Sequence, residues 1–231
     1  MGGCHVVRRA VNTVQSVLCL LIYAAATLWA LTRVSWVELV ADSRGSTCFY
    51  GCAFALFALW LVRRGFDSGL TVHFLGLTAV TLILDWPLAL VAGAIAQLAL
   101  VLLGLDDLAA LGANGLLRVL VPVAITLALS RALEARQPRN LFLYIFISAF
   151  FAAGLSAVGT VMAGMGLLHW SGQLVPPGSL VELLGYLLLV MFPEGFVNGT
   201  AIAALIVFHP DWVETFNTDR YLQAPLDDDK P

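Results

Sequence analysis

The sequence predicts an all-α membrane protein, a polytopic bundle of about seven transmembrane helices. Of its 231 residues, 60% are hydrophobic and 12% are charged, whereas a soluble domain carries roughly 45–50% apolar and about 25% charged residues. The apolar runs are continuous and rich in Leu and Ala, unlike the ~10-residue alternating segments of a transmembrane barrel. A soluble globule of this size cannot bury so much apolar surface, so we expect lipid to be the main solvent.

The same composition excludes several classes of function. The scarcity of charge and the net charge of −3 argue against a disordered protein, a basic nucleic-acid-binding protein and an ordinary water-soluble enzyme. The sequence holds no G-x-S-x-G nucleophile elbow, no H-E-x-x-H zinc motif and no phosphate-binding glycine loop. We therefore expect neither an enzyme nor a nucleic-acid partner.

Seven segments are candidates for crossing a bilayer, which takes about 20 apolar residues. They are 12–32, 47–62, 70–84, 87–104, 112–132, 140–168 and 179–208. The first apolar run continues past Ala24-Ala25-Ala26, which favours an uncleaved span over a signal peptide. We predict a single transmembrane domain over residues 1–210 and a cytoplasmic C-terminal tail over 211–231.

Two places within the apolar runs are expected to interrupt helices. Asp85-Trp86-Pro87 divides residues 70–104, which are too long for one span, so a tight helical hairpin is favoured there. Pro193 and Gly195 mark a second place where the long final segment can carry a broken turn.

The distribution of basic residues predicts that the N-terminus lies outside and the C-terminus inside. With seven spans, the inner loops hold seven basic residues and the outer segments hold four. This orientation places His5, His73, His169 and Asn114 at the outer face, and His209 alone among the histidines on the inner side.

Ionisable side chains within spans are functional candidates, because each costs about 2.5–3.5 kcal/mol at mid-helix on insertion scales. Arg118 and Glu194 are the clearest, with Glu182 and Asp85 as further cases. Arg118 and Glu194 could form an ion pair that holds two helices together, or they could line a polar path for a substrate.

Metal-binding side chains also occur at the predicted outer face. Histidine is a common transition-metal ligand, and His73, His169 and His5 are candidates. Near the N-terminus, Cys4 and His5 are adjacent, and a thiolate ligand would shift preference towards Cu(I) or zinc. A tail with no metal is the alternative for this N-terminal segment.

Three stretches resemble the CbiM/NikM-type family, the substrate-capture permeases of cobalt and nickel energy-coupling-factor ABC transporters. The stretches are Val72-His73-Phe74-Leu75-Gly76 with Trp86-Pro87-Leu88-Ala89, Leu111-Gly112-Ala113-Asn114, and Phe192-Pro193-Glu194-Gly195-Phe196-Val197-Asn198-Gly199 with His209-Pro210-Asp211-Trp212-Val213. The resemblance covers roughly residues 50–215, and its C-terminal part looks more like a divergent bacterial branch of the family than its cobalt-transporting core members.

The resemblance implies roles for particular residues. His73 matches the family's metal-ligating histidine, and Asn114 matches an asparagine expected to orient or close the site. Core members begin Met-His and use both residues as ligands, whereas Gly2 stands second here. Either Cys4 and His5 substitute for that start, or this branch has lost metal binding or carries another substrate.

The resemblance predicts a subunit for uptake of a divalent transition metal, Co²⁺ or Ni²⁺, in the bacterial inner membrane. The ion would be captured at the outer face by His73, with His5 and Cys4 assisting. Asn114, Arg118, Glu194 and His169 would support the site or line the path. No cofactor is built in, and uptake would need a separate energy-coupling transmembrane subunit and ATPase subunits. The alternative is a structural or assembly subunit that keeps the fold without binding metal.

Overall fold

The structure, a computed structural model, describes residues 13–61, 64–65, 71–72, 75–136, 140–173 and 179–223. Within these ranges it is helical apart from one antiparallel pairing of two-residue strands, β1 (Arg64–Gly65) with β2 (Thr71–Val72). The helices are α2 (Thr13–Arg33), α3 (Trp36–Ala41), α4 (Ser43–Leu61), α5 (Leu77–Leu102), α6 (Leu111–Gly115), α7 (Val121–Glu134), α8 (Leu141–Leu143), α9 (Ala152–Trp170) and α10 (Leu180–Phe208), with short 3-10 or π segments η1 (Leu108–Ala110), η2 (Leu116–Leu120), η3 (Tyr144–Phe151), η4 (Pro210–Trp212) and η5 (Asp219–Gln223). The predicted all-α class is confirmed.

Five helical stretches of the described chain are long and apolar enough to cross a membrane. They are Thr13–Arg33, Leu77–Leu102, Leu108–Glu134, Leu141–Trp170 and Leu180–Phe208. Large apolar side chains are exposed along α2 and α10, including Val14, Leu28, Val181 and Phe192, as expected where lipid is the solvent. A multi-pass membrane protein is therefore confirmed, whereas the full count of seven crossings stays a prediction.

The break predicted at Asp85-Trp86-Pro87 is present within α5. Asp85 has φ of 62° and ψ of 165°, outside the helical region, and separates a first arm, Leu77–Leu84, from a second that continues to Leu102. The first arm has eight residues and is about 12 Å long, less than half of the roughly 30 Å hydrocarbon core. The predicted hairpin is thus a bent helix whose first arm is too short to cross alone.

The segment after α10 completes the hydrogen bonding of that first arm. Pro87 has no N–H to offer the Ile83 carbonyl, so the break frees carbonyls at the end of the arm. The backbone N–H of Glu214 donates to the Ile83 carbonyl at 3.2 Å, and the Leu82 carbonyl accepts from both the N–H (3.2 Å) and the hydroxyl (2.9 Å) of Thr215. The C-terminal segment is therefore tied to the centre of the bundle.

Apolar packing reinforces this attachment. Val213, Phe216 and Tyr221 are buried in one cluster with Tyr144 of η3 and Leu82 of the first arm. The Tyr144 and Phe216 rings meet edge to face, with centroids 5.1 Å apart. Residues 213–221 of the predicted C-terminal tail thus pack on the helical domain.

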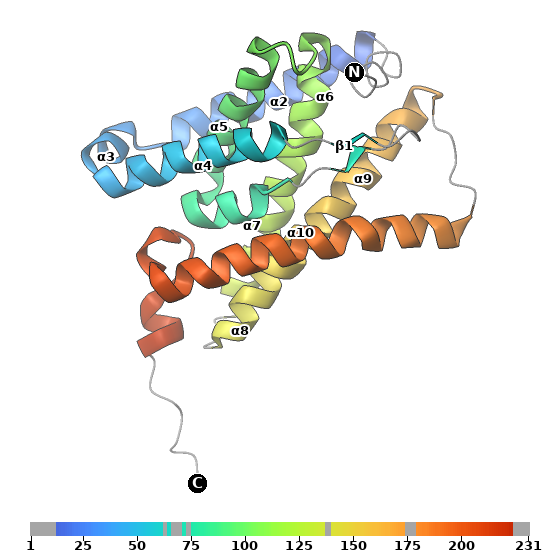
Figure 1. Cartoon of the computed structure of the whole chain (residues 1–231). Helices are drawn as coiled ribbons and strands as arrows, with labels where there is room; N and C mark the ends of the chain where they lie inside the picture. Colours follow the sequence, from blue (N-terminus) through green and yellow to red (C-terminus); the bar gives the residue numbers. More distant parts are fainter. Residues whose placement is uncertain are drawn as a thin grey trace.

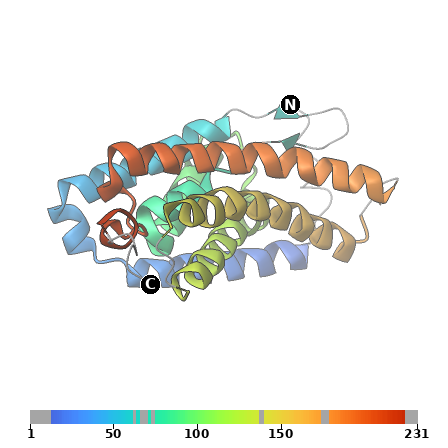
Figure 2. The ribbon, with the colours of Figure 1, turned by 90° about the horizontal axis from the view of Figure 1, so that it is seen from below.

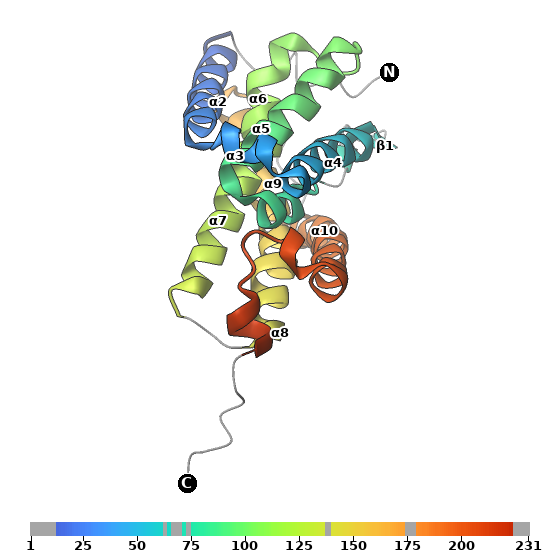
Figure 3. The ribbon, with the colours of Figure 1, turned by 90° about the vertical axis from the view of Figure 1, so that its left-hand side faces the viewer.

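The helix ends and the turns between helices lie on different sides of the molecule. The turn between α2 and α4, the end of α10 and the C-terminal turns lie on the left in Figure 1, whereas the end of α4, β1, the end of α9 and the start of α10 lie on the right. Figure 3 views the molecule from that left-hand side, with α3 and the C-terminal turns towards the viewer. Seen from below, α10 and α2 lie on opposite sides, with α9 and α7 between them (Figure 2). The turn that joins α5 to α6 lies apart from both groups, at the top of Figure 1, and α7 runs to the lower left in Figure 3.

Candidate functional site

The carboxylate of Glu194 in α10 accepts hydrogen bonds from the backbone that leads into α5. Its side chain is 3% exposed. Oε2 accepts the N–H of Leu75 at 2.9 Å and Oε1 accepts the N–H of Gly76 at 2.8 Å. One buried carboxylate thus binds two consecutive backbone amides that lie more than a hundred residues away in the sequence.

Asn198, one helical turn further along α10, adds hydrogen bonds to the same part of the chain. Its Oδ1 accepts the N–H of Ala79 at 2.9 Å, and its Nδ2 donates to Oε1 of Glu194 at 2.8 Å. Residues four apart lie on one face of a helix, so both side chains reach the same target. We call this pair the Glu194–Asn198 clasp.

The Glu194–Asn198 clasp supplies hydrogen-bond acceptors for N–H groups at the start of α5. The first N–H groups of a helix have no intrahelical partner and form the positive end of its dipole. The capping position is Gly76, which has φ of 67° and no side chain to accept a hydrogen bond. A carboxylate placed there is electrostatically favourable, and its hydrogen bonds are stronger than those between neutral groups.

Trp60, at the end of α4, hydrogen-bonds the same backbone segment, at the Leu75 carbonyl. Its indole Nε1 donates to the Leu75 carbonyl at 3.0 Å, and its side chain is fully buried. Leu75 is therefore bound through its N–H by α10 and through its carbonyl by α4. The chain is fixed two residues after His73.

Glycines let α10 come close enough to its neighbour to bury the clasp. A Cβ on Gly195 would lie 2.9 Å from the carbonyl oxygen of Phe150 in η3, and one on Gly199 would lie 3.3 Å from the Phe150 Cβ. Both glycines follow directly after the clasp residues. The broken turn expected at Pro193 and Gly195 is absent, because α10 is assigned as helix throughout.

The predicted ion pair between Arg118 and Glu194 is wrong. Arg118 in η2 instead forms a salt bridge with Asp106, in the turn after α5, with Nη1 and Oδ2 2.8 Å apart. Both side chains are largely buried, at 14% and 2% exposure. Glu194 is satisfied by backbone amides, so it needs no cation beside it.

The remaining predicted site residues are not brought together around Glu194. Asn114 is buried in α6, one turn before Arg118. His169 is exposed at the last turn of α9, and within the described chain no hydrogen bond joins its side chain to Asn114, Arg118 or Glu194. Cys4, His5 and His73 lie outside the described residues.

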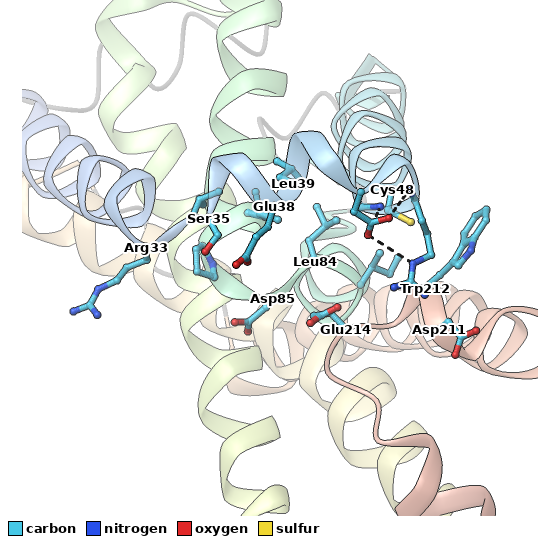
Figure 4. A pocket seen from close by; sticks show the side chains of 17 residues that line it. Arg33, Ser35, Glu38, Leu39, Cys48, Leu84, Asp85, Asp211, Trp212 and Glu214 are labelled. Carbon is cyan, nitrogen blue, oxygen red and sulfur yellow. Dashed lines mark hydrogen bonds and ion pairs between the residues drawn. The ribbon is translucent and has the colours of Figure 1, made fainter.

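A cavity of about 310 Å³ opens on the side where the α2–α3 turn, the bend of α5 and η4 meet. Figure 4 shows Glu38, Asp85 and Glu214 among its lining side chains, with Arg33 at its edge. Over the parts of the chain that the structure covers, no group of three or more His, Cys, Asp or Glu side chains could hold a metal ion.

Asp106 and Asn198 were not predicted as site residues from the sequence. Asp106 falls between predicted spans, so the search for charges inside spans passed over it. Asn198 carries no charge, and the available signal was its spacing of four residues from Glu194 on one helix.

The chain matches a protein-family model over most of its length. The family model described as the cobalt uptake substrate-specific transmembrane region matches residues 7–212. This match includes every helix from α2 to α10. Comparison with curated proteins and with solved structures finds no match.

Proposed function

Because the chain belongs to the family of cobalt uptake substrate-specific transmembrane regions, we propose that it captures Co²⁺ or Ni²⁺ at the outer face of the membrane. Membership makes it a membrane component of cobalt transport, and in this proposal it acts as a transporter subunit without catalytic activity of its own. The observation that carries the proposal is the family match over residues 7–212, which contains His73.

In this proposal His73 is the principal protein ligand, and Cys4 and His5 assist from the N-terminal segment. Neutral imidazole suits nickel and other transition metals of this class. Asn114 orients or closes the site, and His169 lies near the outer entrance. The Arg118–Asp106 pair supports α6 and η2, where Asn114 is held.

The proposal includes partners and a location. The chain carries no ATP-binding motif, so transport requires a separate energy-coupling transmembrane subunit and ATPase subunits. We place the protein in a bacterial inner membrane, surrounded by lipid, with the N-terminus outside and the C-terminus inside.

This topology predicts the outcome of reporter fusions. A phosphatase that is active only outside the cytoplasm should be active when fused after Gln173 and inactive when fused after Gln223. Green fluorescent protein, which fluoresces only inside, should give the opposite pattern, because α10 crosses the membrane between the two positions. The same reporter active at both positions would refute the proposed orientation of α10.

Metal binding by purified protein tests the function directly. We expect the wild-type protein to bind Co²⁺ or Ni²⁺ and His73→Ala to bind it at least about 100-fold more weakly, since loss of an outer-shell partner of a ligand alone costs about 10- to 100-fold. His209→Ala is the matched control, because His209 stacks on Trp212 just after α10 and is predicted to lie on the inner side. Titration calorimetry and elemental analysis of the three proteins provide the measurement.

Two results would count against the proposal. Equal affinity in the wild type and His73→Ala would remove His73 as a ligand. Absence of binding in the wild type would favour the structural or assembly role. Stable co-purification with a membrane complex that contains no ATPase would identify that role.

A further inference from the structure

We propose that the first arm of α5, Leu77–Leu84, moves as one unit about a strained joint at Asp85, and that residues 213–216 fix its position. We call residues 213–216 the C-terminal strap. The strap is hydrogen-bonded to the end of the arm and the Glu194–Asn198 clasp to its start. Release of one end should therefore loosen the other.

Asp85 has a backbone conformation that residues with a side chain rarely adopt. Its φ of 62° and ψ of 165° fall in a region that is essentially restricted to glycine. Within the described ranges it is the one residue other than glycine with a positive φ. Such a conformation persists only where the surrounding structure imposes it, so the contacts around the bend hold Asp85 in this state.

The C-terminal strap imposes the bend through the carbonyls that precede it. The N–H of Glu214 donates to the Ile83 carbonyl at 3.2 Å. The N–H and the hydroxyl of Thr215 donate to the Leu82 carbonyl at 3.2 and 2.9 Å. Because a hydroxyl has a single hydrogen, Thr215 accepts in its 2.8 Å contact with the Tyr144 hydroxyl. The strap thus joins the end of the arm to η3.

The second arm of α5 is fixed to other helices. A Cβ on Gly93 would lie 2.7 Å from Cγ1 of Val119 in η2, so these two segments are in close contact. The Nε2 of Gln97 donates to the Leu111 carbonyl of α6 at 2.8 Å. Asp85 therefore connects an arm bonded to α10 and the strap with an arm bonded to α6 and η2. A movement of one set relative to the other is concentrated at this residue.

The first arm is short enough to carry a displacement from end to end. Its eight helical residues span about 12 Å. At its start, the N–H groups of Gly76 and Ala79 donate to the Glu194–Asn198 clasp at 2.8 and 2.9 Å. Within the arm, the Thr78 and Thr126 hydroxyls are hydrogen-bonded at 2.9 Å. A helix of two turns moves as a unit, so loss of the strap should weaken these contacts as well.

The strap also borders the cavity between the α2–α3 turn, the bend of α5 and η4. Glu214 of the strap and Asp85 of the joint both line this cavity (Figure 4). In the proposed topology the C-terminal segment lies inside, where the energy-coupling subunits act, so a subunit that displaces the strap would change the start of α5. This last step rests on the proposed function, whereas the coupling is measured without metal or partner.

Hydrogen exchange of the purified full-length protein in detergent, resolved to single amides, tests the coupling. Thr215→Val removes the hydroxyl of the strap and keeps the size of the side chain. We expect the amide of Glu214 and, at the far end of the arm, those of Gly76 and Ala79 to exchange about tenfold faster. Coupling between two sites is reciprocal, so Asn198→Leu should accelerate exchange at Glu214 and Thr215.

Two variants control for general loosening and for the loss of a charge. The Thr160 hydroxyl donates to the Leu117 carbonyl at 3.0 Å and joins α9 to η2, so Thr160→Val removes the same kind of hydrogen bond elsewhere. Glu214→Gln keeps the backbone N–H that bonds the arm and removes a carboxylate. In both variants the amides of Gly76 and Ala79 should exchange no faster than in the wild type.

Substitution of Asp85 tests the strained joint. Asp85→Gly removes the conformational penalty, whereas Asp85→Ala removes the same carboxylate and keeps the penalty. We expect the equilibrium constant for unfolding to be about tenfold smaller in Asp85→Gly than in Asp85→Ala. Thermal unfolding of both variants provides the measurement.

The outcomes decide each part of the inference. Faster exchange confined to the strap in Thr215→Val would overturn the coupling, as would equal acceleration by Thr160→Val. Equal or greater stability of Asp85→Ala than of Asp85→Gly would overturn the strained joint. Should Thr215→Val not fold, Tyr144→Phe takes its place, because it removes the hydrogen bond to the strap and keeps the aromatic ring. If the wild type binds no metal, the proposed function fails, while these measurements still decide the coupling.

Discussion

Replacing Gly112 with alanine is expected to lower the free energy of unfolding by about 3 kcal/mol, the upper part of the range for overpacked sites. Gly112 lies in α6, where the backbone of α2 passes directly against it. A Cβ at this position would lie 2.6 Å from the Cα of Leu20 and closer still to its backbone nitrogen. Backbone atoms cannot turn aside as a side chain can, so the two helices would have to separate.

The loss should be large because close helix contact is a main source of stability in lipid, where small residues allow backbones to approach. Gly115, three residues on, faces the ring of Tyr23 in the same way, so the separation would open that contact as well. Thermal unfolding of detergent-solubilised protein, followed by tryptophan fluorescence, provides the measurement.

Gly185→Ala in α10 is the matched control for Gly112→Ala. An added Cβ at Gly185 meets nothing within 4 Å, and alanine is favoured over glycine in a helix by roughly 0.8–1.0 kcal/mol. We expect this variant to be as stable as the wild type or slightly more so. Equal stability of the two variants would refute the close α2–α6 contact.

Much of the fold could be predicted because it depends on local chemistry. Continuous apolar runs indicated the helices, and Pro87, which cannot donate a hydrogen bond, marked the break in α5. The length of the first arm could not be predicted. Residues 70–76 continue the same apolar run without a proline or an acidic residue, and the arm begins at Leu77 because α10 caps it from outside.

The candidate site was less accessible to sequence reasoning because its contacts are long-range. Glu194 was identified as an unusual charge, yet a carboxylate in lipid was expected to need a cation. The partner proved to be unpaired backbone amides at a helix start, which exist only once the fold has formed. Arg118 is paired with an anion, as expected for a buried cation. The anion is Asp106, which lies twelve residues earlier and just outside the predicted span.

Arg118→Met is expected to destabilise the protein by about 3–5 kcal/mol, the cost of breaking a buried ion pair by removing one partner. Methionine keeps much of the apolar length of arginine but removes the cation 2.8 Å from Asp106. The carboxylate would remain at 2% exposure, where water cannot replace the lost charge. Thermal unfolding in detergent, as for Gly112→Ala, measures the effect.

An exposed pair supplies the comparison for Arg118→Met. Arg44 and Asp42 are 3.9 Å apart with both side chains about half exposed, and such pairs contribute about 0.2–1 kcal/mol. Arg44→Met should therefore be nearly neutral. If Arg118→Met were equally mild, the buried pair could not be holding η2 against the turn that follows α5.

A double variant then decides between the two roles considered for Arg118. Replacing both partners, Arg118→Met with Asp106→Leu, removes the carboxylate together with the cation and should recover most of the stability lost in Arg118→Met. If the pair only joins helices, the folded double variant should bind Co²⁺ or Ni²⁺ as the wild type does. A stable double variant with strongly weakened metal affinity would instead make Arg118 and Asp106 part of the substrate path. We expect the first result, because both partners are largely buried between η2 and the turn after α5, at 14% and 2% exposure.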